Sequence, residues 1–95
     1  MLENKFKTKL IKEIRERLPG SIVLHINPPP QGIPDLIVLN GKRWAALEGK
    51  KESNSSRRPN QDYWIEKMNG MSFAAFISPE NKEEVLNAME RSFSD

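Results

Sequence analysis

The sequence predicts an α/β domain in which a mixed four-stranded sheet is flanked by helices. Three observations carry this prediction: apolar residues recur at helical spacing near the start, four short β-prone runs follow, and helical segments lie before and after the fourth run. The expected order of elements is α-β-β-β-α-β-α. With 95 residues, the chain has room for a single domain, residues 1–95, with a thin core.

The first helix is expected over residues 2–18 and ends at Pro19-Gly20. Its apolar face consists of Phe6, Leu10, Ile11, Ile14 and Leu18. The run SIVLHI at residues 21–26 is the expected first strand. The loop at residues 27–32 contains three prolines, which favour an extended path after that strand.

The second and third strands are expected at residues 35–39 and 43–50, on either side of Asn40-Gly41. Asn-Gly between two β-prone runs is typical of a two-residue hairpin turn. Such a turn pairs Leu39 with Lys42 and makes the two strands antiparallel neighbours.

This hairpin gathers two acids and a lysine on one face of the sheet. In the register set by the turn, Asp35 faces Ala46 and has Glu48 as its diagonal neighbour, about 7–8 Å away at the backbone. A loop of four residues would place Asp35 directly opposite Glu48. Because side chains alternate along a strand, every even loop length keeps Asp35, Glu48 and Lys50 on the same face.

The second helix is expected to have Pro59 as its first residue and to stop at Gly70. Residues 72–77 (SFAAFI) form the fourth strand, and the helix before it makes the third and fourth strands parallel neighbours. Ser78 and Pro79 are residue types favoured at the N-cap and first position of a last helix. That helix carries Val85, Leu86 and Met89 on its apolar face.

Two polar residues lie on the apolar faces of expected helices. Glu3 falls between Leu10 and Ile14 on the helical wheel, so it points toward the sheet. Gln61 lies mid-stripe, among its helical neighbours Trp64, Ile65 and Met68. Both positions need an explanation, because an apolar face normally excludes such side chains.

Taken singly, each polar residue has an ordinary explanation. Glu3 would complement the helix dipole, Gln61 would be an amide near a helix start, Asp35 would be a strand-entry turn residue, and Glu48 with Lys50 would be a surface ion pair. Jointly, these readings must place three acids, a lysine and an amide around one spot by accident. Three converging carboxylates would repel one another, and a hard divalent cation such as Mg²⁺ relieves that repulsion.

Composition excludes several other kinds of chemistry. The chain has no cysteine, so disulfides, thiolate zinc sites and cysteine nucleophiles are excluded, and a single histidine excludes most histidine-based zinc sites. The net charge of +2 is small, but residues 42–58 carry six bases and two acids, whereas residues 59–95 carry three bases and seven acids. No leader-like or membrane-spanning run is seen, so a cytoplasmic location and no membrane partner are expected.

The motif residues resemble those of a known nuclease superfamily. Gly32-Ile33-Pro34-Asp35-Leu36 and Glu48-Gly49-Lys50 resemble the PD-(D/E)XK signature of the restriction-endonuclease-like superfamily. Within it, the chain most resembles the VRR-NUC family, whose small stand-alone members occur in bacteriophages. Glu3 and the Arg58-Pro59-Asn60-Gln61 segment support the resemblance, and the αβββαβ order is that of the superfamily core. Gly49 departs from the pattern, because the family usually has a bulky apolar residue there.

The resemblance implies a metal-dependent phosphodiesterase. Its metal ligands would be Asp35, Glu48, the Gly49 carbonyl and, directly or through water, Glu3. The expected ion is Mg²⁺, with Mn²⁺ able to substitute, and it would activate water and neutralise charge on the phosphodiester. Lys50 would orient or deprotonate the water or stabilise the transition state, and Gln61 would position Lys50 or the water.

The resemblance also implies a DNA substrate. Lys42, Lys51, Arg57 and Arg58, beside or just after the third strand, are the expected phosphate contacts. We expect a homodimeric, structure-selective DNA endonuclease that prefers Holliday junctions and acts in the host cytoplasm if it is phage-encoded. Two alternatives stay open: a nonspecific, flap- or nick-directed nuclease that works with a replication partner, and a non-catalytic DNA-binding module on the same fold.

Overall fold

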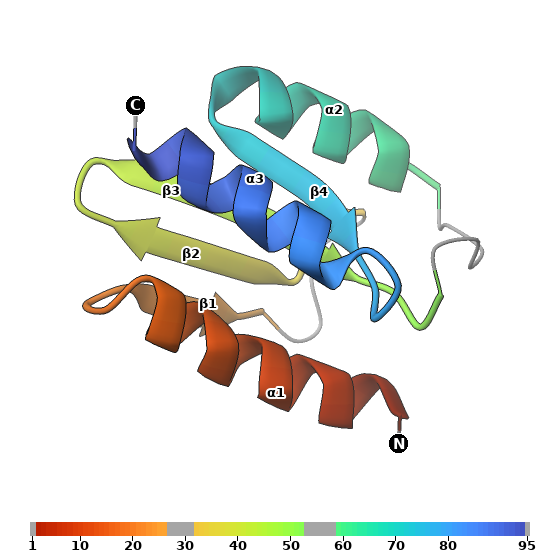
Figure 1. Cartoon of the computed structure of the whole chain (residues 1–95). Coiled ribbons are helices and arrows are strands. Elements are labelled where there is room, and N and C mark those ends of the chain that lie inside the picture. The colour runs from red at the N-terminus through yellow and green to blue at the C-terminus, as the bar shows by residue number, and fades with distance from the viewer. Residues whose placement is uncertain (1, 27–31, 53–58, 95) are drawn as a thin grey trace.

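The computed structural model describes residues 2–26, 32–52 and 59–94, and for residues 2–4 it describes the backbone alone. The elements are α1 (Leu2–Arg17), β1 (Ile22–His25), β2 (Leu36–Asn40), β3 (Arg43–Gly49), α2 (Gln61–Met71), β4 (Phe73–Ile77) and α3 (Lys82–Ser94) (Figure 1). The predicted α-β-β-β-α-β-α order is confirmed.

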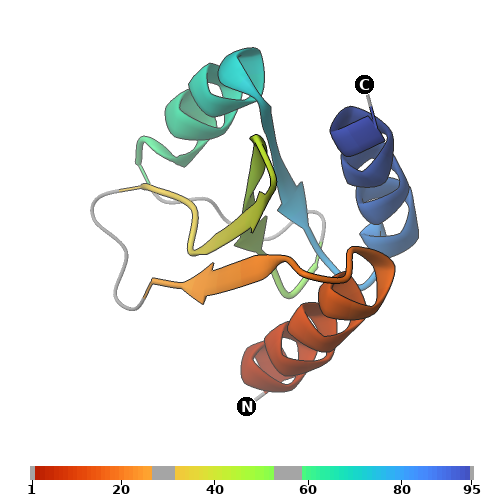
Figure 2. The ribbon, with the colours of Figure 1, turned by 90° about the vertical axis from the view of Figure 1, so that its left-hand side faces the viewer.

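A single mixed sheet has the strand order β1-β2-β3-β4. β2 is antiparallel to both β1 and β3, whereas β3 and β4 are parallel, as the helix between them predicts. Figure 2 shows α1 and α3 on one face of the sheet and α2 on the other. α2 packs on β4 and β3, so the face that it covers is covered unevenly.

The hydrophobic core lies between the sheet and the helices α1 and α3. It comprises Leu10, Ile14, Leu36, Val38, Ala45, Leu47, Ile77, Val85, Leu86 and Met89. Leu10 and Ile14 are the core residues that the helical spacing of α1 predicts, and both are fully buried. Burial of each large aliphatic side chain contributes about 1.5–3 kcal/mol, so this layer holds the sheet in place.

The opposite face is only partly covered. Ala46 and Ala74 are buried there. Ile22 and Leu24 on β1 and Leu39 on β2, which lie on the same face, remain 57%, 46% and 37% exposed. The sheet therefore presents an apolar surface on β1 and β2 beside the covered region.

The hairpin register differs from the predicted one by two residues. Leu39 pairs with Trp44 and Asn40 pairs with Arg43, so the turn is Gly41-Lys42 and not Asn40-Gly41. The Asn40 amide donates to Ser21 Oγ at 2.8 Å, which helps to keep this residue in β2. Gly41 has a φ of 61° and supplies the positive φ that a two-residue hairpin turn needs at its first central position.

Two helix starts also lie later than predicted. α2 begins at Gln61, and its N-cap Asn60 is in the left-handed region with a φ of 73°, so Pro59 precedes the helix. α3 begins at Lys82, and the Asn81 carbonyl accepts from Val85 N at 3.0 Å. Ser78 is not its N-cap; its backbone N–H donates to Asn81 Oδ1 at 2.7 Å, in a turn that leads into the helix.

None of the helices within the described ranges combines the length and apolar character that a membrane span requires.

Candidate active site

Asp35 and Glu48 come together at one end of the sheet. Asp35 directly precedes β2, and Glu48 is the second-last residue of β3. Because Leu36 pairs with Leu47, the same register places Asp35 opposite Glu48 and not opposite Ala46. The predicted shared face survives the changed turn because a shift of two residues preserves side-chain alternation. Both acids are buried, with 4% and 8% of their surfaces exposed.

The segment that carries Asp35 is fixed by its backbone. The Asp35 carbonyl accepts from Ile26 N at 2.8 Å, and its Oδ1 atom accepts a long hydrogen bond of 3.4 Å from Gly49 N. Gly32, with a φ of 81°, lies so close to the start of α2 that a Cβ atom would be 2.9 Å from the Asn60 carbonyl carbon. Gly32 thus allows the motif segment and the N-terminus of α2 to approach each other.

Lys50 and Gln61 form the second half of the site. Lys50 N donates to the Ile77 carbonyl at 2.8 Å, which continues the pairing of β3 and β4 past Gly49. Its ammonium donates to Gln61 Oε1 at 2.8 Å and lies 5.8 Å from the centroid of the Phe76 ring. Both side chains are buried, so the amide that the sequence places on the apolar stripe of α2 meets the buried lysine.

The surroundings of Glu48 disfavour the charged form of its carboxyl group. Burial and the neighbouring Asp35 charge raise the pKa of Glu48 to about 7, although Lys50 and Lys7 oppose the increase. Its Oε1 atom is buried and has no hydrogen-bond partner among the described residues. An unsatisfied buried acceptor of this kind costs about 1–3 kcal/mol, and more when it is charged.

The donor atoms at this end of the sheet fit a hard divalent cation. Asp35 and Glu48 offer carboxylate oxygens, and Gly49 adds a backbone carbonyl at the same strand end. Glu48 Oε1, which no described residue contacts by a hydrogen bond, has lone pairs available for a cation. Mg²⁺ prefers one or two carboxylates together with water, which matches this set. In the described residues, no three His, Cys, Asp or Glu side chains cluster as a metal site.

The third predicted carboxylate, Glu3, lies on the first turn of α1, but its side chain falls outside the described residues. Its contribution to the site stays a prediction.

Sequence reasoning missed Lys7. Its ammonium forms an ion pair and hydrogen bond with Asp35 Oδ2, and Lys7 is the contact that α1 makes with the acid pair in the described structure. His25 Nε2 also lies 4.0 Å from the same oxygen. Lys7 is four residues after Glu3 and three before Leu10, so the helical wheel that singles out Glu3 carries the same signal for Lys7.

The predicted DNA contacts are dispersed. Lys51 is exposed directly after Lys50. Lys42 lies in the β2–β3 turn, at the end of β3 opposite to Glu48 and about 20 Å from it at the rise of a β-strand, and its contact with DNA stays a prediction. Its position follows from the strand between them, which is too long to bring both ends to one site. Arg57 and Arg58 lie outside the described residues.

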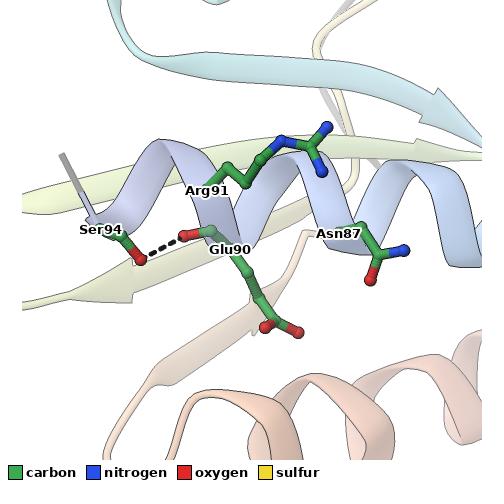
Figure 3. Close-up of a pocket in the computed structure, with 4 residues that line it drawn as sticks. All are labelled: Asn87, Glu90, Arg91 and Ser94. Carbon is green, nitrogen blue, oxygen red and sulfur yellow. Dashed lines mark hydrogen bonds between the residues drawn. The ribbon is translucent and has the colours of Figure 1, made fainter.

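Two surface hollows are lined by residues other than Asp35 and Glu48. The first runs along α3 and is lined by Asn87, Glu90, Arg91 and Ser94 (Figure 3). There, Ser94 Oγ donates to the Glu90 carbonyl at 3.0 Å, and the Glu90 carboxylate is bound by Arg17. The second hollow lies between α1 and β1 and is lined by Thr8, Ile11, Lys12, Arg15, Glu16, Val23 and His25. Neither contains Asp35 or Glu48.

Comparisons with protein-family models, curated proteins and solved structures found no match to this chain.

Proposed function

We propose that the protein is a Mg²⁺-dependent DNA endonuclease whose fold is the restriction-endonuclease-like αβββαβ core of the VRR-NUC type. One observation carries the proposal: Asp35, Glu48 and Lys50 meet at one end of the sheet, where a buried Glu48 oxygen has no hydrogen-bond partner among the residues that the structure describes. Most buried polar atoms of a purely structural pair are hydrogen-bonded, whereas an oxygen without a donor can serve as a cation ligand. The motif resemblance supplies the reaction class.

Each residue of the site would have a separate role in the reaction. Asp35, Glu48 and the Gly49 carbonyl would hold the cation, with Glu3 as a further contact. The bound ion supplies Lewis-acid charge that favours deprotonation of water and neutralises the phosphodiester. Lys50, held by Gln61 at 2.8 Å, would present its ammonium to the reacting water or to the developing negative charge. Burial of both side chains keeps this contact in a region of low dielectric constant, where it is strongest.

For the substrate and the assembly, the support is the sequence resemblance. We propose that branched DNA, with four-way junctions preferred, is the substrate, that Lys51, Arg57 and Arg58 contact its phosphates, and that the enzyme works as a homodimer in the cytoplasm. In a dimer, two active sites would nick two strands symmetrically. Light scattering at micromolar concentration tests the dimer, and a stable monomer would contradict it.

Cleavage of labelled junction, flap, duplex and single-stranded DNA with Mg²⁺ or Mn²⁺ tests the activity. We expect paired nicks on junctions by the wild type and loss of cleavage in Asp35→Ala and Lys50→Ala. Glu66→Ala, which removes an exposed acid from α2, is the matched control and should cleave normally. Equal cleavage by the two site variants would remove the proposed site.

The same experiment separates the alternatives. Unpaired nicks or cleavage of every substrate would favour the nonspecific or flap-directed nuclease. If the wild type binds DNA and cleaves none of the substrates, the non-catalytic binding module is supported instead.

A further inference from the structure

We propose that Lys7 is the counter-ion of the acid pair and that a divalent cation must displace Lys7 from Asp35. We also propose that the missing side chain at Gly49 leaves the space through which Lys7 reaches Asp35. The inference rests on the proposed metal site and adds a residue that controls the affinity of that site. It makes Lys7 a residue on α1, outside the motif strands, that sets the metal affinity.

Lys7 reaches the acids from the other face of the sheet. It shares one side of α1 with Leu10 and Ile14, which pack in the core between α1 and the sheet. Asp35 precedes β2, so its carboxylate lies at the end of the sheet, where a side chain from the core side can reach it. The Lys7 ammonium binds Asp35 Oδ2 there, and 17% of the Lys7 side chain is exposed.

The path of this side chain crosses Gly49. Gly49 alternates with Glu48, so a side chain at this position would point to the core face, toward α1. A Cβ atom there would lie 3.0 Å from Lys7 Cε, 3.6 Å from Cγ and 3.9 Å from Cδ. The lysine stem therefore runs over the space that a side chain at Gly49 would fill. Gly49 does not have a positive φ, so contact with Lys7 and not backbone strain is what a larger residue would change.

The charges of Asp35 and Glu48 explain why the Lys7 ammonium lies beside them. The buried carboxylates of Asp35 and Glu48 lie opposite each other on neighbouring chain segments and repel each other. The Lys50 ammonium donates a hydrogen bond to Gln61. Lys7 places a positive charge on Asp35, whereas Glu48 Oε1 has no hydrogen-bond partner within the described parts of the chain. An ammonium and a divalent cation at Asp35 Oδ2 repel each other and compete for the lone pairs of the same carboxylate. Metal binding must therefore release Lys7, and the free energy of that contact is subtracted from the metal affinity.

Titration with Mn²⁺ at pH 8, followed by the loss of the free-ion signal in electron paramagnetic resonance, tests the inference. In Lys7→Gln, we expect a Kd about tenfold lower than in the wild type, which corresponds to ~1.4 kcal/mol. Lys9→Gln removes the same charge from an exposed position on the same helix and should bind as the wild type does.

A second variant keeps the lysine and moves it. Gly49→Ala retains the backbone carbonyl and places a methyl group against Lys7 Cε, so it should lower the Kd in the same direction by a smaller factor. This variant covers the case in which Lys7→Gln folds poorly. An unchanged or higher Kd in the folded variants, with normal binding by the wild type, overturns the counter-ion role and leaves the nuclease proposal intact. An absence of binding by all of the proteins overturns the metal site itself.

Thermal unfolding supplies a readout independent of activity. Without metal, Lys7→Gln should unfold below the wild type, because the acid pair loses its counter-ion. Saturating Mn²⁺ should raise the Tm of Lys7→Gln more than that of the wild type, since ligand binding adds stability according to affinity. An equal rise in both proteins would contradict displacement of the lysine.

Discussion

Two charged clusters lie at opposite ends of α1, and they are built in opposite ways. Near the C-terminus of the helix, Arg17 binds Glu13 at 3.0 Å, Glu83 at 2.6 Å and Glu90 at 2.8 Å. Lys82 also binds Glu13 at 2.7 Å. These groups are partly exposed, and each carboxylate has a cation, so the cluster ties α1 to α3.

Near the N-terminus of α1, the Asp35–Glu48 pair is buried and incompletely neutralised. In the part of the chain that the structure describes, one carboxylate oxygen of Glu48 has no hydrogen-bond partner, and the pKa of this group is raised to about 7. At the other end, the hydrogen bond from Lys82 lowers the pKa of Glu13 in spite of its partial burial. The contrast shows that this fold can pair its charges where they only hold helices together. Unpaired, stressed carboxylates are typical of functional sites.

The largest expected effect is on catalysis. Asp35→Asn should lower the rate of DNA cleavage by about 10³-fold or more, as loss of a key electrostatic group does in other enzymes. Arg17→Gln, in the paired cluster, should change it less than about threefold. Single-turnover rates with Mg²⁺ measure both. Similar losses of cleavage rate in the two variants would show that the acid pair and the Arg17 cluster do not differ in their importance for catalysis.

The next effect concerns pH and has opposite signs in the two clusters. Because the folded pKa of Glu48 is raised from 4.5 to about 7, its contribution to stability is present below pH 4.5 and is lost as pH rises through 7. Without metal, the wild type should lose up to about 3 kcal/mol relative to Glu48→Gln over this range.

For Glu13 the pKa is lowered, so its contribution is present above pH 4.5 and is lost on acidification. Exposure limits it to a few tenths of a kcal/mol. Urea unfolding of the wild type, Glu48→Gln and Glu13→Gln from pH 4 to 8 measures the two slopes. A fall in stability toward pH 8 that persists in Glu48→Gln would contradict the assignment to Glu48.

The smallest effect is on the paired cluster itself. Arg17→Gln should destabilise the fold by about 0.5–1 kcal/mol, because the ion pairs are exposed and solvent screens them. Added salt should reduce the difference. A loss of several kcal/mol in the free energy of unfolding, insensitive to salt, would show that the cluster behaves as a buried ion-pair network and not as solvent-screened surface pairs.

The parts of the site that follow from local periodicity were predictable. Alternation along the hairpin places Asp35, Glu48 and Lys50 on one face for any even loop, which is why the wrong turn residues did not harm this prediction. The helical stripe likewise brought Gln61 to the sheet, where it meets Lys50.

What depends on contacts between distant segments was not predictable. The Asn40 side chain, which the Asn-Gly turn rule places in the turn, instead donates to Ser21, the residue just before β1. Lys7 was missed because a lysine on an apolar stripe can extend to solvent, and only the packing of α1 over Gly49 aims it at Asp35. The distance of Lys42 from the site follows from the full length of β3, which local charge counting ignores.

The most direct test of the central claim, that Asp35 and Glu48 form a divalent-cation site, is anomalous diffraction from crystals grown with Mn²⁺. We expect an anomalous peak between the two carboxylates, within coordination distance of both, with the Lys7 ammonium no longer on Asp35 Oδ2. Saturating Mn²⁺ with no peak at this position, and with Lys7 still bound to Asp35, would contradict it.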